Sequence, residues 1–77
     1  MTKEYTVIDE NTGKEIGRAN GEVNYDTNPP ELSLQLNINP SATQRFTIRS
    51  SDYSEQFEEC KVTSITNGNY VTFVLKA

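Results

Sequence analysis

Apolar and polar residues alternate most regularly in residues 32–38, where three leucines and an isoleucine occupy every second position. This period of two predicts a half-buried β-strand, because successive side chains of a strand point to opposite faces of the sheet. After a polar turn at residues 39–43, a second alternating segment follows. We expect the two segments to form a hairpin that pairs Leu36 with Phe46, since a shift of one residue would turn the apolar face outward.

The dipeptide Asn67-Gly68 predicts another hairpin near the C-terminus. Asn-Gly between alternating apolar residues is the strongest short-range hairpin signal, because both residues tolerate the positive φ angles of a two-residue turn. Such a turn places Ile65 opposite Tyr70, and both of them, with Val74, on a mixed outer face. The inner face is apolar and comprises Cys60, Val62, Val71, Phe73 and Leu75.

The first part of the chain predicts a third hairpin. Residues 3–9 have the β-rich composition of a strand, and the turn that follows ends with Gly13, which can adopt a left-handed conformation. Two registers are open, because Asp9 can pair with Lys14 or with Glu15. The first register avoids a repulsion between two carboxylates.

Residues 15–25 continue the β pattern, but glycines at positions 17 and 21 interrupt it. A bend or bulge within one long strand and two shorter strands both fit this segment. The consecutive prolines Pro29 and Pro30 lack backbone N–H donors and therefore predict a loop at residues 26–30.

The β pattern lapses after residue 50. Asp52 followed by Glu55 fits a capping box at the start of a helix, so one short helix is expected near residues 52–58. The alternative is an extended loop that enters the last hairpin at Phe57.

Together these segments predict a mainly β fold in a single compact domain that spans residues 1–77. Five to six antiparallel strands would form a small barrel or sandwich. An α+β sheet covered by the short helix is the alternative. A chain of 77 residues leaves no room for a second domain, and it buries only about 60% of the surface that its unfolded form exposes.

The composition speaks against an enzyme. The chain has no histidine and one cysteine, Cys60. An internal disulfide and a Cys/His metal site are therefore excluded, and the usual general base of nucleophilic catalysis is missing. Cys60 is expected to be buried and inert, because it lies on the apolar face of the last hairpin. We expect no catalytic residues, no cofactor and no metal.

A small non-enzymatic protein-interaction module is the function that these observations favour. It would act as an accessory or inhibitor protein through a sheet surface or a strand edge, and its partner would be another protein or a second copy in a homodimer. The candidate partner-binding residues are Ile65, Tyr70 and Val74. Apolar side chains on a mostly polar face need a cover, which comes either from the chain itself or from a partner.

The alternative function uses the acidic residues. Eleven acidic and seven basic residues give a net charge of −4, which disfavours nucleic acid as a partner. An acidic protein can instead mimic a nucleic-acid backbone and inhibit a DNA-binding protein, and Glu55, Glu58 and Glu59 are the candidate residues for this role. The sequence holds no apolar segment of the kind found in signal peptides or membrane spans, so a cytoplasmic location is expected.

Overall fold

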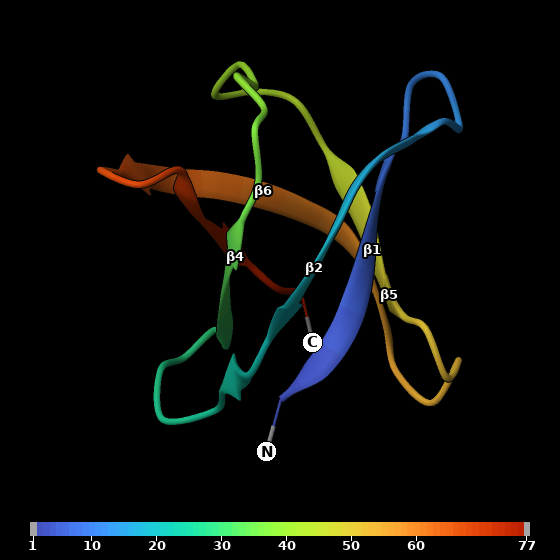
Figure 1. Cartoon of the computed structure of the whole chain (residues 1–77), viewed down its shortest axis with the longest axis vertical. Helices are drawn as coiled ribbons and strands as arrows, with labels where there is room; N and C mark the ends of the chain where they lie inside the picture. The colour runs from blue at the N-terminus through green and yellow to red at the C-terminus, as the bar shows by residue number, and fades with distance from the viewer. Residues whose placement is uncertain (1, 77) are drawn as a thin grey trace.

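The computed structural model describes residues 2–76, and every regular element among them is a β-strand (Figure 1). The seven strands are β1 (Lys3–Asp9), β2 (Glu15–Gly21), β3 (Val23–Asn24), β4 (Glu31–Gln35), β5 (Phe46–Ser50), β6 (Gln56–Thr66) and β7 (Tyr70–Val74). The prediction of a mainly β fold is confirmed, with slightly more strands than expected. None of the described residues belongs to a helix that could cross a membrane.

The strands form one antiparallel sheet in the order β2-β1-β5-β6-β7-β4-β3, which curves into a nearly closed barrel (Figure 1). Strands β5, β6 and β7 follow one another as a meander, and β1 and β4 flank this meander. Residues 36–45 carry the chain from β4 to β5, which are separated in the sheet by β6 and β7. This long connection crosses from one side of the β6–β7 pair to the other, so that strands from both halves of the chain enclose one core.

The barrel closes where β2 approaches the β4 segment. A Cβ atom at Gly17 would lie 2.9 Å from Cδ2 of Leu36. One at Gly21 would lie 2.7 Å from Cδ2 of Leu34 and 2.9 Å from the carbonyl oxygen of Ser33. These separations are shorter than ordinary van der Waals contacts. The Leu36 side chain could move away from a Cβ atom at position 17, but the backbone oxygen of Ser33 could not, so the approach requires glycine at position 21. Gly21, one of the two glycines that interrupt the β pattern, therefore lets β2 approach β4 where the barrel closes.

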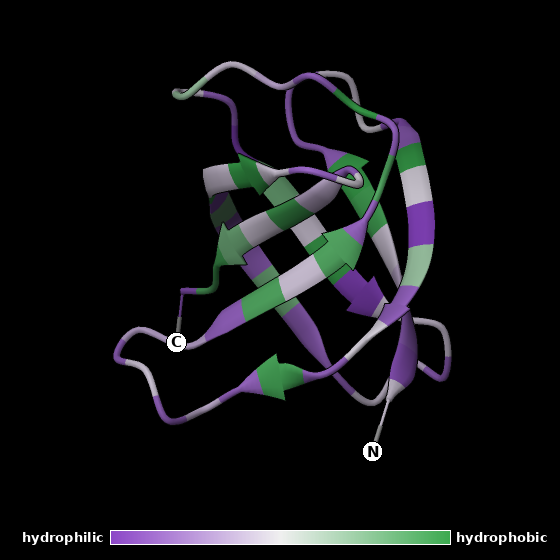
Figure 2. Ribbon diagram, turned by 60° about the vertical axis from the view of Figure 1, so that its left-hand side comes forward, coloured by the Kyte–Doolittle hydropathy of each residue, from purple (hydrophilic) through white to green (hydrophobic). Residues whose placement is uncertain are grey.

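Buried side chains alternate with more exposed ones along β4, β5 and β7, and hydrophobic and hydrophilic bands alternate along the ribbon in Figure 2. Phe46 and Phe73 are fully buried and meet edge to face, with their ring centroids 5.6 Å apart. Val62 is half-buried against this core. The buried apolar residues are Tyr5, Val7, Val23, Leu32, Leu34, Leu36, Phe46, Ile48, Cys60, Val71, Phe73 and Leu75.

The predicted hairpin between the two most regular segments is wrong. β4 pairs with β7, where Leu34 lies opposite Val71, and β5 pairs with β1 and β6. Phe46 therefore lies opposite Cys60 instead of Leu36. Alternation correctly predicted which side chains face the core. It could not predict the partner strand, because several strands offer an equivalent apolar face.

The predicted helix near residues 52–58 is absent. The chain turns there, with a φ angle of 60° at Tyr53, and β6 begins at Gln56. The alternative of an extended entry into the last hairpin is therefore confirmed. Asp52 does act as a cap, but on a turn: its Oδ1 accepts hydrogen bonds from the amide of Ser54 over 3.0 Å and from the Ser54 hydroxyl over 2.6 Å. An aspartate can therefore cap a turn in the same way as it caps the first turn of a helix.

The C-terminal hairpin forms as predicted, but its loop has three residues instead of two, with positive φ angles at Gly68 and Asn69. The extra loop residue shifts the register next to the turn. A bulge at Thr63 restores it, so Val62 lies opposite Phe73 as predicted.

The first hairpin follows the first of its two registers at the turn, where the amide of Asp9 donates to the carbonyl of Lys14 over 2.9 Å. Further along, a register shift places Gly17 instead of Ile16 opposite Val7. The segment after this hairpin is divided into β2 and β3, and the predicted loop with its two prolines separates β3 from β4.

Candidate functional site

Strand β6 is the longest strand of the described residues, and the two halves of the barrel share it (Figure 1). Its first part pairs with β5 as far as Cys60, and its second part pairs with β7 from Lys61 to Thr66. β5 and β7 lie on opposite edges of β6. Residues 61–66 therefore use only one of their two edges, and no strand within residues 2–76 pairs with the other. This unpaired edge is called the free edge below.

The change of partner along β6 coincides with a local distortion. Glu59 has a φ angle of 57°, and the register between β5 and β6 shifts at this point. The amide of Glu59 donates to Oε2 of Glu10 over 2.7 Å, and the hydroxyl of Thr47 donates to the same oxygen over 3.2 Å. Glu10, in the first turn, thus satisfies the backbone of the bulge that divides β6 into its two parts.

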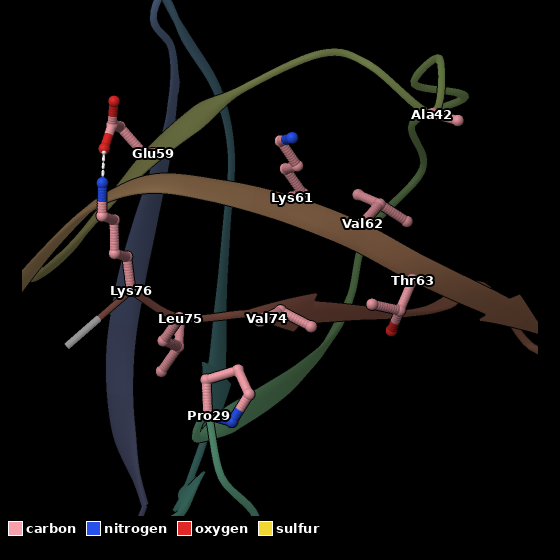
Figure 3. Close-up of a pocket in the computed structure, with 9 residues that line it drawn as sticks. All are labelled: Pro29, Ala42, Glu59, Lys61, Val62, Thr63, Val74, Leu75 and Lys76. Carbon is pink, nitrogen blue, oxygen red and sulfur yellow. Dashed lines mark hydrogen bonds and ion pairs between the residues drawn. The ribbon is translucent and has the colours of Figure 1, made fainter.

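A groove of about 450 Å³ lies beside the second part of β6 (Figure 3). β6 and the end of β7 supply most of its lining, and the loops that contain Pro29 and Ala42 border it. The exposed atoms in the groove are mainly apolar. The lining residues are Pro29, Ala42, Glu59, Lys61, Val62, Thr63, Val74, Leu75 and Lys76.

The charged residues at the groove are compensated unequally. The carboxylate of Glu59 pairs with Lys76 and lies 3.7 Å from Arg45. The hydrogen bond from Lys76 is the main reason that the pKa of Glu59 is below its usual value. Lys61 is exposed, and no carboxylate within residues 2–76 forms an ion pair with it. Lys61 is therefore a cation beside the free edge that no carboxylate of the described chain contacts as an ion pair, although its charge contributes, after those of Lys76 and Arg45, to the lowered pKa of Glu59.

The three residues predicted to contact a partner do not share one face. Val74 is half-buried and lines the groove. Tyr70 and Ile65 are 48% and 44% exposed near the turn. However, Ile65 lies opposite Val71, on the core side of the sheet, whereas Tyr70 lies opposite Thr66. The predicted pairing of Ile65 with Tyr70 is wrong because the loop has one more residue, and the role of all three residues in binding stays a prediction.

The sequence-based reasoning did not identify the groove. The apolar pattern places Val62 on the inner face of the last hairpin, and neither Val62 nor Lys61 was among the candidate binding residues. Pro29 and Ala42 lie in loops that only the topology of the whole barrel brings to β6. The one usable signal was Lys61 itself, a single charge in the last β6 segment, whose six residues are otherwise uncharged.

The three acidic residues of the alternative function take part in different contacts. Glu55 forms an ion pair with Lys3 at 2.7 Å, and Glu59 pairs with Lys76. Glu58 is exposed. Two of the three carboxylates are thus compensated by neighbouring ammonium groups.

Glu55 is the centre of a polar cluster. Its Oε1 accepts hydrogen bonds from the hydroxyls of Tyr5 over 3.2 Å and Tyr25 over 3.4 Å, while its Oε2 pairs with Lys3. Burial, assisted by the charge of Glu55, raises the pKa of Tyr5 to about 12. Both carboxylate oxygens are engaged and Tyr5 keeps its proton at neutral pH. The cluster therefore links β1, the segment after β3 and the segment before β6.

Cys60 occupies its predicted place on the inner face of the last hairpin and is fully buried. Burial raises the pKa of its thiol to about 12, so the nucleophilic thiolate is scarce at neutral pH. Within residues 2–76, no three His, Cys, Asp or Glu side chains are grouped in a way that could hold a metal ion.

Asp52 makes the turn before β6 sensitive to pH. Its Oδ1 accepts hydrogen bonds from the hydroxyls of Ser50 and Ser54, each over 2.6 Å. These bonds, that of Ser50 first, hold the pKa of Asp52 well below its usual value. In the unfolded chain this carboxyl titrates near pH 4, roughly. The carboxylate therefore stabilises the fold above that pH, and this contribution is lost as the pH falls toward the lower value of the folded state.

We expect Asp52→Asn to narrow the difference in melting temperature between about pH 6 and about pH 3. Asparagine does not titrate, so the variant loses the pH-dependent contribution of residue 52 to the stability. Circular dichroism at both pH values measures this difference. Asp26→Asn, which replaces another exposed aspartate, should keep the wild-type difference. A wild-type difference in Asp52→Asn would contradict the role of Asp52.

Comparison of the chain with protein-family models, with curated proteins and with solved structures gave no match. Function is therefore inferred from the residues and the geometry of the chain itself.

Proposed function

We propose that this protein is a non-enzymatic interaction module that binds an extended segment of another protein along the free edge of β6. The observation that carries the proposal is the one-sided pairing of residues 61–66, which form a ladder with β7 only. An unpaired edge presents N–H and C=O groups that an incoming strand can satisfy, and such strand addition derives affinity from main-chain hydrogen bonds.

The groove spans the second part of β6 and residues 74–76. It supports the proposal, because strand addition derives its specificity from pockets for alternate side chains. Val62 and Val74 are half-buried, and both line the groove (Figure 3). Val62 belongs to β6 itself, and a bound segment that covers its exposed part removes apolar surface from water, which stabilises a complex by roughly 25 cal/mol per Å².

The other edges of the sheet are less suited to this role. β3 has only two residues, which offer too few hydrogen bonds for a stable added strand. The outer edge of β2 approaches β4 at Gly17 and Gly21. The first part of β6 is distorted at Glu59. Glu58 and Glu59 place two adjacent carboxylates there, and charged side chains on a strand edge discourage pairing.

A selection of random peptides displayed on phage against the immobilised protein tests the proposal. We expect the selected peptides to share apolar residues at alternate positions, because side chains of an added strand face the sheet in turn. In NMR spectra of the ¹⁵N-labelled protein, these peptides should shift the amide signals of residues 61–66. A selection without enrichment, or shifts confined to other strands, would reject strand addition at β6.

A further inference from the structure

We infer that the segment added to β6 carries a carboxylate opposite Lys61 and belongs to a different protein, not to a second copy of this chain. The inference rests on the proposed strand addition and specifies the chemistry of the partner. It follows from the register of β6 and from the charges at its free edge.

The pairing of β6 with β7 shows which residue pattern a neighbouring strand must have. Directly opposite residues of antiparallel strands lie on the same face of the sheet. Val62 and Ile65 lie opposite the buried residues of β7, whereas Lys61 lies opposite half-buried Val74 on the outer face. A regular strand at the free edge would therefore place apolar residues beside Val62 and Ile65 and its next residue beside Lys61.

The residue beside Lys61 is selected by charge. Lys61 is exposed and forms no ion pair with the described residues, and the nearby carboxylate of Glu59 is engaged by Lys76. Opposite charges at directly paired positions stabilise a sheet, and like charges destabilise it. A lysine on an unpaired edge also discourages indiscriminate pairing. Lys61 therefore favours a strand with a carboxylate at this position and disfavours other strands.

A second copy of β6 does not supply this carboxylate. When two free edges pair so that Val62 of each copy lies opposite Ile65 of the other, Lys61 lies opposite Thr66. In this register the carboxylates of Glu58 and Glu59 lie beyond the paired residues. No carboxylate of the second copy would therefore lie opposite Lys61 in such a dimer.

Two blocked peptides, Thr-Val-Thr-Val-Glu-Thr and the same sequence with Lys in place of Glu, test the inference. Bound antiparallel, they set Val opposite Ile65 and Val62 and the variable residue opposite Lys61. NMR titrations give their dissociation constants for the wild type, for Lys61→Glu and for Lys14→Glu. Lys14 is an exposed lysine in the first hairpin and carries the matched change of charge.

We expect the wild type to bind the Glu peptide about threefold to tenfold more tightly than the Lys peptide. Lys61→Glu should reverse this preference, and Lys14→Glu should keep it. Equal binding of the two peptides by the wild type would overturn the inference and leave strand addition intact. Absence of shifts at residues 61–66 with either peptide would overturn both. A wild-type dimer in light scattering, with concentration-dependent amide shifts at residues 61–66, would overturn the choice of a different protein.

Discussion

Phe73→Ala is expected to destabilise the folded chain by about 3–5 kcal/mol, the usual range for truncation of a buried phenylalanine. Phe73 lies in β7 between two paired strands, opposite Val62 of β6 and Leu32 of β4. Its ring is fully buried and meets that of Phe46 across the core. A loss of this size is a large share of the stability of a typical small domain, which is about 5–15 kcal/mol.

Urea unfolding followed by circular dichroism measures this loss. Tyr70→Ala is the matched control, because it removes an aromatic ring from the same strand at a position that is 48% exposed. We expect the control to lose no more than about 1 kcal/mol. Similar losses in the two variants would contradict the claim that the burial of Phe73 in the core determines its contribution to the free energy of unfolding.

Gly21→Val is expected to cost about 3 kcal/mol, at the upper end of the usual range for overpacking. The new Cβ atom would lie 2.9 Å from the carbonyl oxygen of Ser33 and 2.7 Å from Cδ2 of Leu34. A backbone oxygen cannot move aside as a side chain can. The approach of β2 to β4 must therefore widen, which opens the barrel where it closes.

The control for this substitution is Asn20→Val, which adds a β-branched side chain at the exposed neighbouring position of β2. It should change the free energy of unfolding by about 0.5 kcal/mol or less. Equal urea midpoints for Gly21→Val and Asn20→Val would contradict the close contact between β2 and β4.

Local patterns predicted the strands and their core faces well, because alternation and turn chemistry are encoded within a few residues. Leu34, Phe46 and Cys60 are buried as expected. The pairing of β4 with β7 was beyond local patterns, since it depends on how the complete sheet closes. The pattern at Asp52 failed for another reason: a capping residue satisfies the amides of a turn as readily as those of a helix.

The candidate site was less predictable than the fold. Val74 was expected to need a cover, and it does line the groove. The free edge itself was not predicted. It exists because β6 extends beyond its last pair with β5 at Cys60. The sequence of one strand does not show how far its partner strand will extend beside it. Pro29 and Ala42 border the groove through tertiary contacts that have no local signature.

The most direct measurement for the proposed binding mode is a set of intermolecular nuclear Overhauser effects between a selected peptide and the ¹⁵N,¹³C-labelled protein. Strand addition predicts close contacts between backbone protons of the peptide and backbone protons of residues 61–66, in the alternating order of an antiparallel ladder. A bound peptide whose contacts with the protein involve side chains alone, or the backbone of another strand, would contradict the assignment of the β6 free edge as the binding site.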